Sequence, residues 1–177
     1  MTPSIDASRK IANTCTKLFS DYPFAHRQPK HAGHCAQIHG HNWSFEVTFS
    51  ATELDECGFV VDFGGLAWAK KFLTENFDHT TVLNEDDPAR ALLEGANVMM
   101  REALTEKPQH RLSTDAPRRA APMFNFVFIP DCSCEGIARL VLEVLNAGVL
   151  HRTDGRVTVS RVRVFEDSKN SATATWG

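Results

Sequence analysis

Apolar and polar residues alternate along the N-terminal third of the chain, and a period of two predicts β-strands. The clearest alternation runs over 43–49 (WSFEVTF), where every second residue is large and apolar. The segment 14–25 is also strand-like, although Pro23 interrupts it. A partner strand is predicted over 57–63 (CGFVVDF), after a turn at 55–56.

Three other segments repeat their apolar residues at spacings of three and four, which is typical of amphipathic helices. The first covers 66–77 and follows Asp62, whose side chain is a suitable N-cap. The second covers 89–104, and the third covers 137–145. Between these two, the segment 106–122 contains prolines and charges of both signs, so an exposed loop is expected there.

Two later strands complete the pattern, at 123–129 (MFNFVFI) and at 156–166 (RVTVSRVRVFE). The alternation of the second strand slips near Ser160, which predicts a β-bulge. The order is three strands, a helix, an insert at 89–122, a strand, a helix and a final strand. This order predicts an α+β protein with one antiparallel sheet and its helices on one face.

Length and composition limit what the chain is expected to do. A chain of 177 residues predicts one domain covering 1–177, with 1–10 disordered. The net charge of −3 provides no basic surface, so neither nucleic acid nor a membrane is expected as a partner. The N-terminus lacks the apolar core of a signal peptide, and no apolar run approaches the length of a bilayer span. The five cysteines have scattered spacings typical of reduced thiols, which predicts a cytoplasmic protein.

A histidine-rich segment, GHCAQIHGH at 33–41, is the first candidate for chemistry. His39 and His41 have the same parity as the apolar residues of 43–49, so both imidazoles are expected on the buried face of that strand. Zinc requires a third nitrogen, and His26 at the end of the first strand is the best donor. The alternative, two ordinary polar residues at a strand end, stays open for so short a motif.

Cys35 lies four residues before His39, in a polar loop rather than in an apolar run. Free cysteines are usually small buried hydrophobes, and this is the ordinary interpretation of the residue. A nearby cation would instead lower the pKa of the thiol and favour the reactive thiolate.

Six further segments stand out along the chain from Phe19 to Ala174, namely FSDYPFAH, CAQIHGHNW, GFVVDFGGL, FDHTTVLNEDDP, CSCEGIA and VFEDSKNSATA. Together, and in this order, they resemble the segments of one family, the 6-pyruvoyltetrahydropterin synthase and 6-carboxytetrahydropterin synthase superfamily. The insert at 89–122 is longer than in short members of the family.

The resemblance implies a zinc ion held by His26, His39 and His41. Zinc in this neutral site would act as a Lewis acid on the side-chain hydroxyls of a dihydroneopterin triphosphate. Cys35 would be the proton-transferring base, as thiolate. His79, with Asp78 beside it, would be the second proton-transfer group. Because adjacent residues of a strand point in opposite directions, Asp78 can orient this imidazole only if the backbone there is irregular.

The resemblance also implies residues that bind the pterin. Glu166 would accept two parallel hydrogen bonds from the N2/N3 edge of the ring, since a carboxylate matches that edge. Ser133 and Glu135 would contact the pterin, or would simply cap the following helix. No motif indicates which cations bind the triphosphate, and the candidates are Arg27, Lys30 and Lys169.

The four-residue spacing from Cys35 to His39 resembles that of the carboxy-forming branch, which acts in queuosine synthesis. This branch converts 7,8-dihydroneopterin triphosphate to 6-carboxy-5,6,7,8-tetrahydropterin, releasing acetaldehyde and triphosphate. One alternative is the pyruvoyl-forming reaction, which eliminates triphosphate. An alternative of another class is a non-enzymatic oligomeric module that zinc stabilises.

The family's fold is the tunnelling fold, a four-stranded antiparallel sheet with two helices on one face. Its subunits join their sheets into a barrel, and its active sites lie between subunits. The resemblance therefore implies a homo-oligomer, with a hexamer favoured, and a small-molecule substrate. An isolated sheet with open edges would require such partners.

Overall fold

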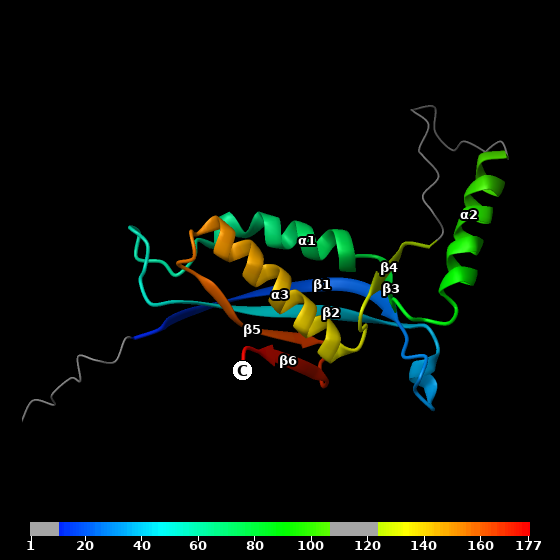
Figure 1. Ribbon diagram of the computed structural model, residues 1–177, viewed down its shortest axis with the longest axis horizontal. Coiled ribbons are helices and arrows are strands. Elements are labelled where there is room, and N and C mark those ends of the chain that lie inside the picture. Colours follow the sequence, from blue (N-terminus) through cyan, green and yellow to red (C-terminus); the bar gives the residue numbers. More distant parts are fainter. Residues whose placement is uncertain (1–10, 107–123) are drawn as a thin grey trace, which may run out of the picture.

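One six-stranded sheet forms the centre of the protein, and α1 and α3 cover one of its faces (Figure 1). The computed structural model describes residues 11–106 and 124–177, and for 100–106 it describes the backbone alone. The predictions made for 1–10 and for 107–122 lie outside the described residues. The elements are β1 (Asn13–His26), β2 (His39–Ala51), α1 (Ala67–Phe77), β3 (Thr80–Asn84), α2 (Arg90–Glu106), β4 (Phe126–Ile129), α3 (Cys134–Arg152), β5 (Thr158–Phe165) and β6 (Ser171–Thr175).

The sheet is mixed, with the strand order β4-β3-β1-β2-β5-β6. The pairs β1–β2, β2–β5 and β5–β6 are antiparallel, whereas β3 is parallel to β1 and β4 is parallel to β3. The predicted sheet of four antiparallel strands is therefore wrong as a description of the whole sheet. Of the two parallel strands, β4 lies within the strand predicted at 123–129, whereas β3 was not predicted. The helix α2 lies between β3 and β4 along the chain, as a crossover between parallel strands requires.

Two predictions near the first helix had different outcomes. The strand predicted at 57–63 is wrong, because turns and bends occupy this segment. The Asp55 carboxylate accepts hydrogen bonds from the backbone N–H groups of Cys57 at 2.9 Å and Phe59 at 2.8 Å, which stabilises the turn. Asp62 is an N-cap, but of the 3-10 helix Phe63–Leu66 that leads into α1: its Oδ1 accepts from the N–H of Gly64 at 2.9 Å. The N-cap position of α1 itself is Leu66.

The C-terminal strands contain the predicted bulge. Thr48 of β2 pairs with Arg161, but the next residue of β2, Phe49, pairs with Val159. Ser160 is therefore the extra residue of β5, as its sequence pattern predicted. β6 was not predicted as a separate strand. It begins after a tight turn in which Asp167 accepts from backbone N–H groups.

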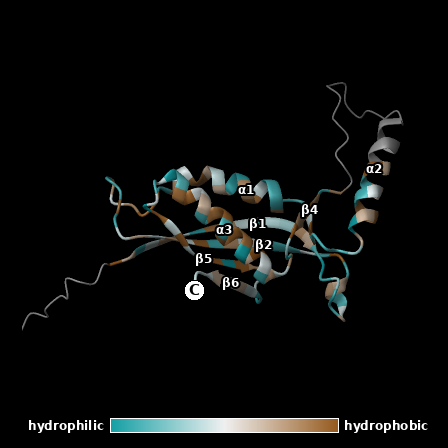
Figure 2. Cartoon of the chain, in the orientation of Figure 1, coloured by the Kyte–Doolittle hydropathy of each residue, from teal (hydrophilic) through white to brown (hydrophobic). Residues whose placement is uncertain are grey.

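The hydrophobic core lies between the sheet and the two covering helices. The large apolar residues of 43–49 are all fully buried, as their alternation predicted. They pack with Leu73 and Phe77 of α1 and with the apolar side of α3. Figure 2 shows hydrophobic residues along β5 and α3, where these elements contact each other. None of the helices in the described segments combines the length and hydropathy that a bilayer crossing requires.

A close contact between α1 and α3 depends on Gly148, within α3. A Cβ atom at this position would lie 2.4 Å from the Trp68 ring, whose face also stacks on the Arg152 guanidinium at 4.3 Å. We expect Gly148→Ala to lower the free energy of unfolding by about 1–3 kcal/mol, because the indole must shift. Gly95→Ala in α2 is the matched control, since a Cβ there meets nothing within 4 Å.

Urea unfolding of both variants measures this effect. The control variant should be neutral or more stable by up to about 1 kcal/mol, because alanine has the higher helix propensity. Equal stability changes in the two variants would show that the Trp68 contact does not require glycine.

Candidate active site

Three histidines meet where β1 ends and β2 begins. In the antiparallel register His26 lies opposite His39, and Phe24 lies opposite His41, so the three imidazoles leave the same face of the sheet. Their ring centroids are 4.7 Å apart for His26–His39, 5.1 Å for His39–His41 and 5.7 Å for His26–His41. The structure therefore brings together the three histidines that the sequence singled out.

Glu166 joins this cluster from the end of β5. Its Oε1 lies 3.2 Å from Nε2 of His26 and 3.5 Å from Nε2 of His41. The ligand atoms that the three histidines and Glu166 offer all lie within 4.8 Å of one another. Sequence reasoning assigned Glu166 to the pterin and missed this contact. The available signal was parity, since Val162 and Val164 are buried at alternate positions of β5 and Glu166 continues the series.

Two of the imidazoles are oriented by backbone carbonyl groups. Nδ1 of His26 lies 2.9 Å from the carbonyl oxygen of Cys132, and Nδ1 of His39 lies 2.8 Å from that of Gln37. Because a carbonyl oxygen only accepts, each Nδ1 must carry the proton, and in the neutral ring the lone pair is then on Nε2. Metal-binding histidines commonly have this second hydrogen bond, which fixes the tautomer and the ring orientation.

Two buried nitrogens of the cluster lack a hydrogen-bond partner in the described structure. Nε2 of His26 and Nε2 of His41 are both buried and accept no hydrogen bond within the described structure. Burial is the largest cause that lowers the pKa of His26, and it favours the neutral ring. Leaving a buried polar atom unsatisfied costs about 1–3 kcal/mol, and a cation between these atoms would remove that cost. A set of imidazoles and one carboxylate fits a divalent transition metal.

A rigid aromatic layer supports the histidines. The rings of Phe24 and Trp43 stack at a centroid distance of 4.5 Å, and the Trp43 indole donates to the Phe24 carbonyl at 3.2 Å. Trp43 is fully buried, and its ring contacts His26 edge to face at 4.9 Å. Because this layer fixes both strand ends, it positions the imidazoles before any ligand binds.

Cys35 lies in the connection between β1 and β2, within a short 3-10 helix (His34–Ala36). Cys35 is half-buried, and its backbone carbonyl accepts from the N–H of Gln28 at 2.7 Å. This bond closes the connection that leads directly to His39. Cys35 therefore lies in the connection that ends at His39, and its proton-transfer role stays a prediction.

Asp78 and His79 lie at the junction of α1 and β3. His79 has a positive φ of 54°, and this irregular backbone lets the Asp78 carboxylate lie 2.6 Å from Nδ1 of His79. For Asp78 to orient the imidazole, an irregular backbone was required here, and this requirement is confirmed. The backbone N–H of His79 donates to the Pro23 carbonyl of β1, but its side chain is 83 % exposed and outside the histidine cluster.

Ser133 and Glu135 lie at the start of α3. The hydroxyl of Ser133 accepts from the N–H of Gly136 at 3.0 Å, so Ser133 is the N-cap of this helix. Glu135 is exposed in the first turn, where a negative charge favours the helix dipole. The capping alternative is confirmed for Ser133, and a contact of either residue with the pterin stays a prediction.

Two of the three cations considered for the triphosphate already have carboxylate partners. Arg27 makes two hydrogen bonds to the buried Asp87, at 2.8 and 2.7 Å, and Lys30 lies 2.9 Å from Asp86. Lys169 is exposed in the turn between β5 and β6. Of the three, Lys169 is therefore the one without a carboxylate partner in the described structure.

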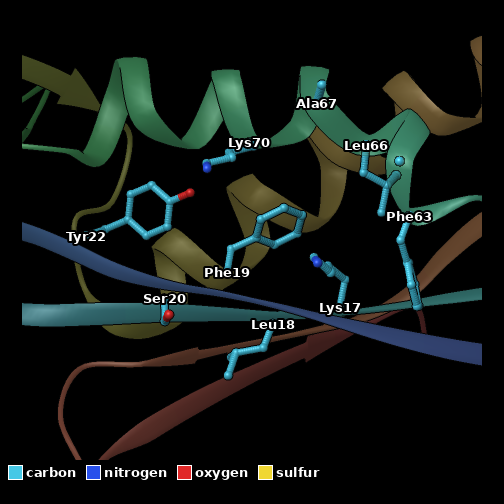
Figure 3. Close-up of a pocket in the computed structure, with 10 residues that line it drawn as sticks. Lys17, Leu18, Phe19, Ser20, Tyr22, Phe63, Leu66, Ala67 and Lys70 are labelled. Atoms are coloured by element: carbon cyan, nitrogen blue, oxygen red, sulfur yellow. The ribbon is translucent and has the colours of Figure 1, made fainter.

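A cavity of about 350 Å³ lies between β1 and α1, away from the histidine cluster (Figure 3). Lys17 and Lys70 point into it beside Phe19 and Tyr22, and no carboxylate is among its described lining residues. None of the predicted site residues lines this cavity. It is therefore separate from the candidate active site.

The fold and the histidine cluster define a pterin synthase-like protein, and comparison with known proteins agrees. The family model described as 6-pyruvoyl tetrahydropterin synthase matches residues 15–176, so the chain belongs to this family of lyase-type enzymes.

Curated relatives carry the name of the carboxy-forming branch. The 6-carboxy-5,6,7,8-tetrahydropterin synthase of Rickettsia typhi is 39% identical over 74 residues, which cover 41% of this chain and 53% of the relative. That of Bacillus subtilis is 39% identical over 64 residues, covering 36% of this chain and 42% of the relative. The chain thus matches about half the length of these relatives.

Solved structures share the fold. An uncharacterized protein from Wolinella succinogenes has a TM-score of 0.70 at 23% identity, covering 94% of this chain and 99% of the other. A catalytic-residue mutant of the 6-pyruvoyltetrahydropterin synthase of Plasmodium vivax has a TM-score of 0.60 at 19% identity, covering 93% and 99%. At these identities the likeness establishes the fold alone.

Proposed function

We propose that the protein is a zinc-dependent lyase that converts 7,8-dihydroneopterin triphosphate to 6-carboxy-5,6,7,8-tetrahydropterin with release of acetaldehyde and triphosphate. The observation that carries this proposal is the cluster of His26, His39 and His41, with two buried Nε2 atoms that lack a partner. The curated relatives support the carboxy product, since they are named for it. The reaction would serve queuosine and related deazapurine synthesis in the cytoplasm.

The three histidines would hold the zinc ion through Nε2. Zinc bound there would supply Lewis acid chemistry toward the side-chain hydroxyls of the substrate and acidify the adjacent C–H bonds. Cys35, as thiolate, would remove and return protons at those carbons. His79 would be the second proton-transfer group. Its Nδ1 is held by Asp78, so Nε2 is the atom free to exchange a proton.

Pterin recognition is assigned to Glu166, whose carboxylate would accept two parallel hydrogen bonds from the N2/N3 edge. The carboxylate is 24 % exposed and lies beside two of the histidines, so a ring bound by it would place its side chain toward the metal site. Glu135 and Ser133, at the start of α3, are the candidates for further contacts with the ring.

A homo-oligomer, with a hexamer favoured, follows from the same assignment. His79 is largely exposed in the single chain, yet a proton-transfer group works best where solvent is excluded. A neighbouring copy would supply that cover. Among the strands of residues 11–106 and 124–177, β4 and β6 are the outer ones, and each has one edge without a pairing strand, where copies of the sheet could join.

Product analysis tests the proposed reaction. The zinc-loaded protein is incubated with 7,8-dihydroneopterin triphosphate, pterins are identified by mass spectrometry, and acetaldehyde is measured enzymatically. We expect 6-carboxytetrahydropterin and acetaldehyde in equal amounts, with His39→Ala protein as the inactive control. A pyruvoyl product without acetaldehyde would indicate triphosphate elimination instead. Bound zinc with no product of either kind would indicate a zinc-stabilised structural module.

A further inference from the structure

The carboxylate of Glu166 faces the histidine cluster and has no other described partner. Its Oε1 is the oxygen 3.2 Å from Nε2 of His26 and 3.5 Å from Nε2 of His41. We propose that Glu166 is the fourth protein ligand of the metal while the substrate is absent, so that the resting site is a closed set of three imidazoles and one carboxylate.

The positions of the protons leave two hydrogen-bond acceptors facing each other. Because Nδ1 of His26 donates to the Cys132 carbonyl, its Nε2 has only a lone pair in the neutral ring. An ionised carboxylate also only accepts. The contact of 3.2 Å lacks hydrogen-bond geometry, since Nε2 of His26 has no hydrogen-bond partner in the described structure. Two acceptors at this distance repel each other unless a cation lies between them.

The distances from Glu166 to the histidines match those between the ligands of a tetrahedral zinc site. Zinc binds imidazole nitrogen at about 2.0–2.1 Å and carboxylate oxygen at about 2.0–2.2 Å in a tetrahedral arrangement. Two ligand atoms of such a tetrahedron are about 3.3–3.5 Å apart. The observed contacts of Oε1 with the two Nε2 atoms, 3.2 and 3.5 Å, are close to this separation. The oxygen therefore already lies where a fourth ligand would be placed.

The backbone of Glu166 is held in place on both sides. Phe165 pairs with Ser44 of β2, and the N–H of Glu166 donates to the Asn170 carbonyl at 3.1 Å. The neighbouring Asp167 is not a competing ligand, because its carboxylate accepts from two backbone N–H groups of the turn at 2.7 Å. Of these two neighbouring carboxylates, that of Glu166 is therefore the one that reaches the cluster.

Under the proposed function, the same carboxylate also binds the pterin edge. One carboxylate cannot hold the metal and the pterin edge at the same time. Substrate binding would therefore require Glu166 to leave the metal, and the same side chain would then bind the incoming ring. The protein would keep a saturated, protected metal site until the substrate arrives.

Metal affinity measured without any pterin tests the proposal. Dissociation constants for zinc are obtained by competition with a chromophoric chelator for the wild-type protein and for Glu166→Gln. Loss of groups that only support a ligand typically costs 10–100-fold in affinity. We therefore expect the loss of a direct ligand to weaken zinc binding at least about tenfold. Glu143→Gln, an exposed carboxylate of α3, is the matched control and should bind as the wild type does.

A second variant tests whether Glu166 binds the metal directly or acts only through its negative charge. Glu166→Asp keeps the charge but shortens the side chain by one methylene, so its oxygen no longer reaches the cluster. If Glu166 is a ligand, this variant should also bind zinc weakly, and the visible spectrum of the Co²⁺-substituted protein should change in both variants. Wild-type zinc affinity in Glu166→Gln, or in Glu166→Asp, would overturn the proposal.

The result is distinguishable from a failure of the proposed reaction. The affinity and spectral measurements contain no substrate, so they report on the ligand set even if the protein forms no pterin product. Conversely, product formation by the wild-type protein together with unchanged metal affinity in Glu166→Gln would leave the proposed reaction in place and overturn only the fourth-ligand assignment. Thermal melts of each variant confirm that the fold is intact.

Discussion

Cys35→Ala should keep its metal and its oligomeric state and lose at least about 10²-fold in turnover. General acid–base groups typically contribute about 10²–10⁴-fold, and the proposed thiolate is one of two such groups. The substitution removes the thiol from a half-buried position in the β1–β2 connection. The backbone bond from Gln28 to the Cys35 carbonyl does not depend on the side chain, so the loop should keep its conformation.

Alkylation by iodoacetamide tests the thiolate directly, because the thiolate fraction sets the rate. Burial raises the pKa of Cys132 and of Cys134 to about 11, so these thiols should react slowly. Cys57 is exposed and supplies the comparison for an accessible thiol. We expect Cys35 to react faster than Cys57 although it is less exposed, and peptide mass spectrometry after timed labelling measures both rates.

The matched control for turnover is Cys57→Ala, which should leave the rate unchanged. A Cys35→Ala protein that binds zinc and turns over normally would contradict the assignment. Cys35 would then be a bystander in the loop before the metal strand, and proton transfer would have to rest on His79 alone.

His39→Ala should abolish tight metal binding and turnover while most of the fold remains. The imidazole is one of three nitrogens in the cluster, and loss of even a supporting group typically weakens metal binding 10–100-fold. We therefore expect zinc affinity to fall by more than about 100-fold. The fold should persist because His39 is the first residue of β2 and only half-buried, whereas the fully buried core begins at Trp43.

Elemental analysis after dialysis measures the bound zinc, and circular dichroism measures the fold. His151→Ala, near the exposed end of α3, is the matched control and should retain one equivalent of metal. One full equivalent of zinc with normal turnover in His39→Ala would contradict the three-histidine assignment. Loss of the folded state in metal-free wild-type protein would instead support the structural module.

The sequence by itself determined the features that depend on local periodicity. The alternation over 43–49 placed the face of β2 correctly, and the same parity placed His39 and His41 beside the core. The N-cap at Asp62 and the bulge at Ser160 were predictable for the same reason. Such features are set by neighbouring residues along the chain, since strand faces and capping bonds repeat over only a few positions.

Tertiary structure alone decided how distant segments meet. The parallel strand β3 is only five residues long, so its own pattern could not indicate that it pairs with β1. The Cys132 carbonyl that fixes the His26 tautomer depends on where the chain enters α3, not on the identity of that side chain. Glu166 meets His26 and His41 only because β5 packs beside β2 in one register. Contacts of this kind arise from the packing of whole elements, which no short stretch of sequence encodes.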